Sequence, residues 1–209
     1  MDADAVEIRV LGCLIEKQRT TPDAYPLSLN SLRLACNQAT ARDPVVAYEE
    51  REIKAALDRM SNQGWTRFAS GASSRALKYR HLLDEALELS GPELSLLAVL
   101  MLRGAQTVGE LKQRSERLHR FESIADVAQT LDALMQRELV ERLERRPGQK
   151  EERWAQLLGD RAQETVEVEP PESPPRGDDR VGAIEERLER LERAFDDLSS
   201  RLDKVPDRE

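Results

Sequence analysis

The sequence is short of aromatic residues, of cysteine and of long apolar runs. Aromatic side chains make up only 4% of its 209 residues, so aliphatic side chains must fill the interior. The two cysteines, Cys13 and Cys36, cannot form a disulfide framework, and both lie on apolar helical faces, so we expect core thiols in a reducing cytoplasm. No run of about 18 apolar residues occurs, so no membrane span is expected. The acidic start, residues 1–4, lacks the basic and apolar regions of a signal peptide.

Motifs that carry catalysis or hold metal ions are also missing. The two histidines, His81 and His119, have no cysteine or carboxylate at ligand spacing, and we expect both to be solvated or locally hydrogen-bonded. There is no phosphate-binding loop, no dinucleotide-binding glycine motif and no nucleophile elbow. We therefore expect no catalytic residue, no metal site and no cofactor, and a protein that is not an enzyme.

The negative charge of the chain is concentrated in its last quarter. Of the formal net charge of −8, residues 159–209 contribute 9 Lys+Arg against 16 Asp+Glu, which is −7. The preceding part of the chain is therefore close to neutral. It lacks the broad positive field of a strongly basic nucleic-acid binder, but a local basic patch can still bind nucleic acid.

One pattern of apolar residues occurs twice. The segment 7–15 has the same pattern as the segment 93–101. Further on, an apolar and acidic pattern recurs in the same way, as Ile53, Leu57, Asp58 and Met60, and then as Val127, Leu131, Asp132 and Leu134. A repeat of this length predicts a duplicated structural unit.

Each copy shows the periodicity of three helices followed by a two-stranded hairpin. In the first copy the predicted helices cover 6–18, 28–37 and 48–63, with Ser28 as an N-cap and Gly64 as a stop, and the strands cover 65–68 and 77–80. In the second copy the first helix covers 93–102, the second begins after the N-cap Thr107, and the third covers 123–137 with Ser123 as its N-cap. The strands of this copy cover 139–143 and 152–155. This order is typical of winged helix-turn-helix domains. We predict a mainly α, α+β fold with tandem winged-helix domains at 1–88 and 89–158.

The first copy holds an insertion. Glu7 and Glu93 are 86 positions apart, whereas Leu57 and Leu131 are 74 apart, so the first copy has 86 − 74 = 12 additional residues around 20–48. An insertion beside a predicted recognition helix is a natural place for function.

The C-terminal part changes character twice. Residues 159–179 are acidic and proline-rich, which predicts an extended linker. Apolar residues then recur three and four apart along 180–205, which predicts a coiled-coil helix that ends at Pro206. The alternative is a helix packed back on its own domains. The seam comprises Val181, Ile184, Leu188, Leu191, Phe195, Leu198, Leu202 and Val205.

Charges beside the seam favour parallel self-association. In a parallel pair of helices, Arg180 faces Glu185 of the partner helix and Arg187 faces Glu192, whereas an antiparallel pair brings like charges together. Exposed pairs of this kind contribute little energy and mainly select the orientation.

Candidate contacts to double-stranded DNA lie on the second hairpin and the first copy's third helix. Arg145, Arg146 and Lys150 surround a tight turn, which suits contact with phosphate. Arg51 and Lys54 would lie near the major groove, but acidic residues crowd the start of that helix. These residues favour a DNA-binding or transcription-regulator-like protein. The alternative is an adaptor whose winged domains bind a protein partner and no nucleic acid.

The chain closely resembles the YceH-like bacterial family. The resemblance covers residues 6–158 and is carried by the runs 10–17, 20–23, 25–30, 35–38, 42–45 and 78–81. It implies two tandem winged-helix domains in a cytoplasmic bacterial protein, and it implies no function. Two features depart from the family pattern: Ala39-Thr40-Ala41 stands where a more polar stretch is expected, and Ala47-Tyr48 replaces an N-cap.

The matching residues place a candidate functional loop within the insertion. They include Asn37, Gln38, Arg42, Asp43 and Pro44. The alternative is that these side chains only tie the loop to the helix ends.

Overall fold

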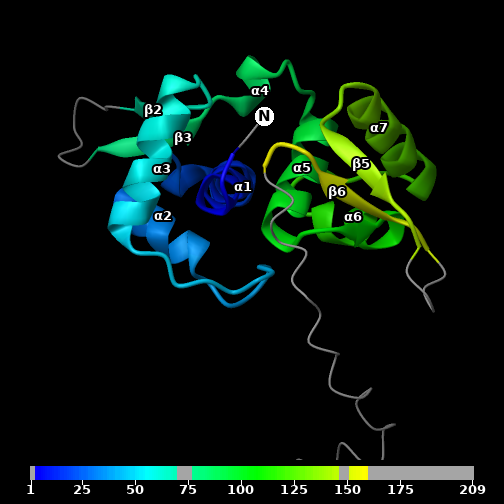
Figure 1. Ribbon diagram of the computed structural model, residues 1–209, viewed down its shortest axis with the longest axis horizontal. Coiled ribbons are helices and arrows are strands. Elements are labelled where there is room, and N and C mark those ends of the chain that lie inside the picture. Colours follow the sequence, from blue (N-terminus) through cyan, green and yellow to red (C-terminus); the bar gives the residue numbers. More distant parts are fainter. Residues whose placement is uncertain (1–2, 70–76, 146–150, 160–209) are drawn as a thin grey trace, which may run out of the picture. The chain divides into compact units, whose positions relative to one another are not determined.

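The described part of the chain is mainly helical with two small antiparallel sheets, so the predicted α+β class is confirmed (Figure 1). The computed structural model describes residues 3–69, 77–145 and 151–159. Residues 1–163 form one compact unit, and both predicted winged-helix domains lie inside it. The predicted coiled-coil helix, nearly all of the linker, and Arg146 and Lys150 lie outside the described residues.

The first half places a hairpin after three helices. The returning strand of this hairpin also pairs with a two-residue strand that precedes the second helix, so the sheet order is β1-β3-β2 and all pairs are antiparallel. The elements are α1 (Ala5–Thr20), a 3-10 turn (Pro22–Ala24), β1 (Leu27–Ser28), α2 (Leu29–Cys36), α3 (Glu50–Asn62), β2 (Thr66–Ala69) and β3 (Lys78–His81).

The second half repeats this arrangement after a short helix, α4 (Leu83–Ala86). Its sheet order, β4-β6-β5, matches that of the first half strand for strand. The order of elements that the repeat predicts is therefore confirmed. The elements are α5 (Gly91–Arg103), β4 (Gln106–Thr107), α6 (Val108–Ser115), α7 (Ile124–Gln136), β5 (Val140–Leu143) and β6 (Arg153–Gln156).

Side-chain caps fix where most helices begin. Ser28, Thr107 and Ser123 accept backbone N–H groups at the starts of α2, α6 and α7, as predicted. The third helix differs from its prediction, because α3 begins at Glu50 and not at Tyr48. A carboxylate of the first turn closes the start of this helix, since the Glu49 N–H donates to Glu52 Oε2 at 2.7 Å.

The two halves share one core through their first helices. α1 and α5 lie side by side and make the most extensive contact between any two described elements. Both are buried around much of their circumference, which explains why the repeated pattern is apolar beyond a single stripe. The helices approach closely at Gly12, where an added Cβ would lie 2.9 Å from Leu102 Cγ and 3.1 Å from Met101 Cβ. A continuous cluster of buried side chains therefore runs through both halves.

Candidate functional site

α2 and α6 begin 79 positions apart, so 86 − 79 = 7 of the additional residues precede α2 and 79 − 74 = 5 lie between α2 and α3. The loop between α2 and α3, residues 37–49, is called the motif loop below. Arg42 fixes its middle. The Arg42 guanidinium is fully buried and makes a bidentate pair with Glu16 on α1, with 3.1 Å from Nη1 to Oε1 and 2.6 Å from Nη2 to Oε2. It also donates from Nε to the Ala35 carbonyl at 3.1 Å and from Nη1 to the Ala41 carbonyl at 2.8 Å. One side chain thus joins α1, the end of α2 and the loop.

A second buried arginine and one asparagine fix the ends of the motif loop. Arg9 on α1 donates to the Cys36 carbonyl at 3.3 Å and to the Pro44 carbonyl at 2.7 Å. Asn37 exchanges two hydrogen bonds with the Tyr48 backbone, at 2.8 and 2.9 Å. Most polar groups of the motif are therefore engaged in holding the loop, which favours the anchoring alternative for Asn37 and Arg42.

The remaining motif residues lie nearer the surface. Gln38 accepts from Lys17 Nζ at 3.3 Å and donates to the Thr40 carbonyl at 2.8 Å. The Asp43 N–H donates to the Leu102 carbonyl at 2.9 Å, which attaches the loop to the end of α5 in the second half. The Asp43 side chain stays exposed.

Two thiols lie beside these arginines. Cys13 and Cys36 are fully buried, as expected for core thiols. Arg9 and Arg42 approach these thiols in space, although neither arginine is adjacent to a cysteine in the sequence. Burial raises the pKa of Cys13, but the hydrogen bond with Cys36 and the charge of Arg42 outweigh burial and hold that pKa below its usual value. The same thiol contact, together with burial, raises the pKa of Cys36.

The buried ion pair has opposite effects on its two members. Burial alone would raise the pKa of Glu16, but the hydrogen bond from Arg42 and its charge hold this pKa below the usual value. Burial would lower the pKa of Arg42, and the hydrogen bond to Glu16 raises it instead. Both side chains are therefore charged at neutral pH.

His81 occupies a second buried polar cluster in the first half. Its Nε2 lies 2.7 Å from Gln18 Oε1, and its Nδ1 lies 3.4 Å from the Asp84 carboxylate without a hydrogen-bond partner among the described residues. The His81 ring is therefore buried and locally hydrogen-bonded, which is one of the two states expected from the sequence, and it is not solvated. Burial lowers the pKa of His81 to about 4, against the attraction of Asp84.

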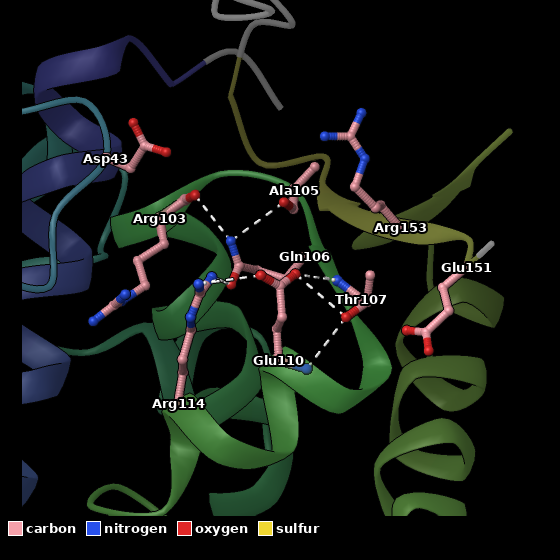
Figure 2. A pocket seen from close by; sticks show the side chains of 9 residues that line it. All are labelled: Asp43, Arg103, Ala105, Gln106, Thr107, Glu110, Arg114, Glu151 and Arg153. Atoms are coloured by element: carbon pink, nitrogen blue, oxygen red, sulfur yellow. Dashed lines mark hydrogen bonds and ion pairs between the residues drawn. The ribbon is translucent and has the colours of Figure 1, made fainter. Parts of the chain in front are cut away.

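A pocket opens beside the motif loop, mostly within the second half. Its volume is about 510 Å3. Figure 2 shows side chains from the loop, α5, β4, α6 and β6 around it, and the hydrogen bonds that fix Gln106 and Arg114. Eight of its nine lining residues are polar or charged. They are Asp43, Arg103, Gln106, Thr107, Glu110, Arg114, Glu151 and Arg153.

The predicted DNA-contacting residues that the structure describes lie on two surfaces. Arg51 and Lys54 are exposed on α3, and each is paired with a neighbouring acid: Arg51 Nε lies 2.9 Å from Glu49, and Lys54 Nζ lies 2.7 Å from Asp58. Arg145 follows β5 and is exposed, with its Nε 3.9 Å from Glu152. The prediction omitted Arg142 on β5, which lies beside the same acid at 3.3 Å. The alternation of β5 gives no signal for Arg142, because it places Arg142 on the same face as the buried Val140.

The described residues contain neither a metal-binding cluster nor a membrane-spanning helix. No group of three or more His, Cys, Asp or Glu side chains is placed to hold a metal ion in this part of the chain. Among the same residues, no helix is long and apolar enough to cross a membrane.

The sequence matches a known family over both halves. The family described as "Protein of unknown function, DUF480" matches residues 3–149. The chain belongs to this family. The resemblance to an uncharacterised bacterial family is thereby confirmed, and the matched residues include the motif loop and most of the pocket lining.

Curated relatives of the DUF480 chain match along most of their length. A UPF0502 protein of Geobacter metallireducens is 47% identical over 192 residues, covering 90% of this chain and 86% of that protein. A UPF0502 protein of Geotalea daltonii is 49% identical, covering 90% and 85%. A UPF0502 protein of Shewanella amazonensis is 42% identical, covering 93% and 96%.

Proposed function

We propose that this protein binds double-stranded DNA without catalysing a reaction, as a tandem winged-helix protein of the cytoplasm. The architecture supports the proposal, because in each half a short strand precedes the second helix and pairs with the returning strand of a hairpin that follows the third helix. This is the arrangement in which a third helix enters a groove and a hairpin contacts the backbone.

The observation that carries the proposal is the cationic second hairpin. Arg142 lies on the first strand of this hairpin, and its side chain is 56% exposed. Arg145 lies just beyond that strand, and its side chain is 62% exposed. Arg146 and Lys150 follow in the sequence around the turn. Among the described residues, Glu152 pairs with both Arg142 and Arg145 and is shared between them, so a phosphate can compete for these two arginines.

The third helices are poorly suited to base reading. On α3, Arg51 and Lys54 pair with acids of their own segment, and Arg59 pairs with acids at the start of α1. α7 presents an exposed Asp132 and no cation within its bounds. An acid at this position repels phosphate, and apolar helix residues read few base edges. We therefore expect DNA binding with low sequence selectivity and strong dependence on salt.

The test is a salt titration of binding to a fluorescent duplex, with the full chain and with a variant carrying Arg145→Gln, Arg146→Gln and Lys150→Gln. Each lost phosphate contact lowers the slope of log affinity against log salt by about 0.9, so the variant should lose up to about 2.7 from that slope. The control is Arg120→Gln, which removes an exposed cation outside the hairpin. No binding of the full chain at low salt, or an unchanged slope in the variant, would overturn the proposal.

A second candidate function, protein binding, is favoured by the first hairpin. There, large apolar side chains are exposed beside the cations of the hairpin: Phe68 is 46% exposed and Leu77 is 61% exposed. Phe68 packs against Tyr79 with ring centroids 5.1 Å apart, which holds it in place on the hairpin. Exposed apolar groups of this kind suit a protein partner better than phosphate. Loss of partner binding by Phe68→Ser with DNA binding intact would assign the two functions to different halves.

A further inference from the structure

The pocket beside the motif loop is built around two arginines, of which Arg114 has its side chain held in position and Arg103 its backbone carbonyl. Gln106 on β4 is buried, and its amide nitrogen donates to the carbonyls of Arg103 and Ala105, at 3.1 and 3.2 Å. Its amide oxygen accepts from Arg114, which also lies 3.1 Å from Glu110 Oε1 (Figure 2). A buried amide therefore ties the end of α5 to the cation of α6 and pre-organises both sides of the pocket.

Arg103 is the unbalanced charge of this pocket. It forms no ion pair with any described residue, although it is partly buried at the end of α5. Burial lowers the pKa of Arg103, and the nearby cations Arg114 and Arg42 lower it further, against the weaker attraction of Glu16 and Asp43. The pocket lining carries as many acids as arginines, but Arg114 and Arg42 already hold carboxylate partners, so the net effect of the neighbouring charges on Arg103 is repulsive. An anion bound beside Arg103 would relieve this repulsion.

We propose that this pocket binds a small anionic ligand through phosphate or carboxylate groups, with Arg103 and Arg114 as the anion-binding side chains. The volume of about 510 Å3 is that of a small-molecule site. Planar guanidinium groups suit the oxygen pairs of phosphate and carboxylate, and the guanidinium of Arg114 is held in place by Gln106 and Glu110. This site is separate from the second-hairpin cations that the proposed DNA binding uses.

The acids of the pocket restrict which anions fit. Glu110 is engaged, since it accepts the Thr107 N–H at 2.9 Å and pairs with Arg114. Asp43 and Glu151 line the pocket without an ion pair among the described residues, so they are available to accept hydrogen bonds from hydroxyl or amino groups. The fitting ligand therefore combines an anionic end with donor groups, as phosphorylated or carboxylated metabolites do.

The position of the pocket connects the ligand to the motif loop. Asp43 belongs to the loop, and its N–H is held by the Leu102 carbonyl directly before Arg103. A ligand seated there would contact both the insertion of the first half and the first three elements of the second half. This relationship gives the motif loop a role beyond anchoring its own ends.

The test is calorimetric titration of the full chain with inorganic pyrophosphate and, separately, with citrate, at matched ionic strength. We expect saturable binding of at least one probe, and the better probe tells whether phosphate or carboxylate is the preferred group. Arg103→Gln should weaken that binding by at least about tenfold, as expected for the loss of one charge-assisted contact. Arg120→Gln, the matched exposed control, should bind as the unchanged chain does.

Three controls keep the result interpretable. Circular dichroism and the melting midpoint establish that Arg103→Gln is folded, and Arg114→Gln provides a second variant if it is not. The Arg103→Gln variant should also keep its DNA affinity, so that a failure of the pocket and a failure of DNA binding can be told apart. Absence of saturable binding for both probes, or equal affinity in Arg103→Gln and Arg120→Gln, overturns the proposal.

Discussion

Glu16 and Arg42 form a bidentate ion pair in which the arginine side chain is 0% exposed, and this pair joins the motif loop to α1. Removing one partner of a buried pair leaves the other charge without compensation. We expect Glu16→Ala to lower the free energy of unfolding by about 3 kcal/mol, as measured by urea denaturation. Lys54→Ala breaks an exposed pair on α3 and should leave the unfolding midpoint unchanged within error. Equal midpoints for the two variants would show that the loop does not depend on the pair.

Stability should also fall in mild acid because of His81. Its pKa is about 4 in the folded protein against 6.5 for the ordinary group, so the unfolded chain binds more protons between these values. The contribution is fully present above pH 6.5 and is lost as the pH falls toward 4. A shift of this size corresponds to about 3 kcal/mol.

The measurement is the free energy of unfolding as a function of pH. The charged groups that face His81 are Asp84 on α4, Arg80 on β3 and Arg19 on α1. His81→Gln should flatten the curve between pH 6.5 and 4, whereas the control His119→Gln should keep the slope. A slope that persists in His81→Gln would assign it to other groups.

The helix contact at Gly12 gives a prediction with an internal control. In Gly12→Ala, the added Cβ lies 2.9 Å from Leu102 Cγ in the joint core, so neighbouring side chains must shift. We expect a loss of about 1–3 kcal/mol in unfolding free energy, typical of overpacking. Gly109→Ala on α6 meets nothing within 4 Å, so it should be neutral or stabilising through its helix propensity. The reverse order of the two midpoints would contradict the close helix packing.

The parallel coiled coil stays a prediction, because residues 180–205 lie outside the described residues. We expect the full chain to sediment as a homo-oligomer and a chain that ends at residue 179 to sediment as a monomer. A fluorophore pair attached at position 180 of two copies should show close approach if the helices are parallel. An unchanged sedimentation coefficient after truncation would favour the alternative of a helix packed on its own domains.

The sequence predicted what depends on local pattern and missed what depends on distant contacts. Helix periodicity and cap residues such as Ser28 are local, and they located the helices to within a few residues. The short strands β1 and β4 went unpredicted, because two residues carry no periodicity and their partners lie far along the chain, as in the pairing of Leu27 with Tyr79.

The candidate sites show the same limit. The motif loop was located from its residues, but the role of Arg42 depends on Glu16, which is 26 positions away. The pocket was missed altogether, because it gathers Asp43, Arg103, Arg114 and Arg153 from four separate segments. No spacing within any one segment indicates that these charges meet.

The contact between α1 and α5 bears on how a repeated protein of this kind can arise. Each of these helices buries an apolar face against the other, so neither half has a complete core by itself. A single ancestral copy would have exposed that face to water and could have covered it only by pairing with a second copy of itself. Joining two copies in one chain makes the pairing intramolecular and independent of protein concentration. Once joined, the copies are free to diverge on their outer surfaces while the shared helix face keeps them together.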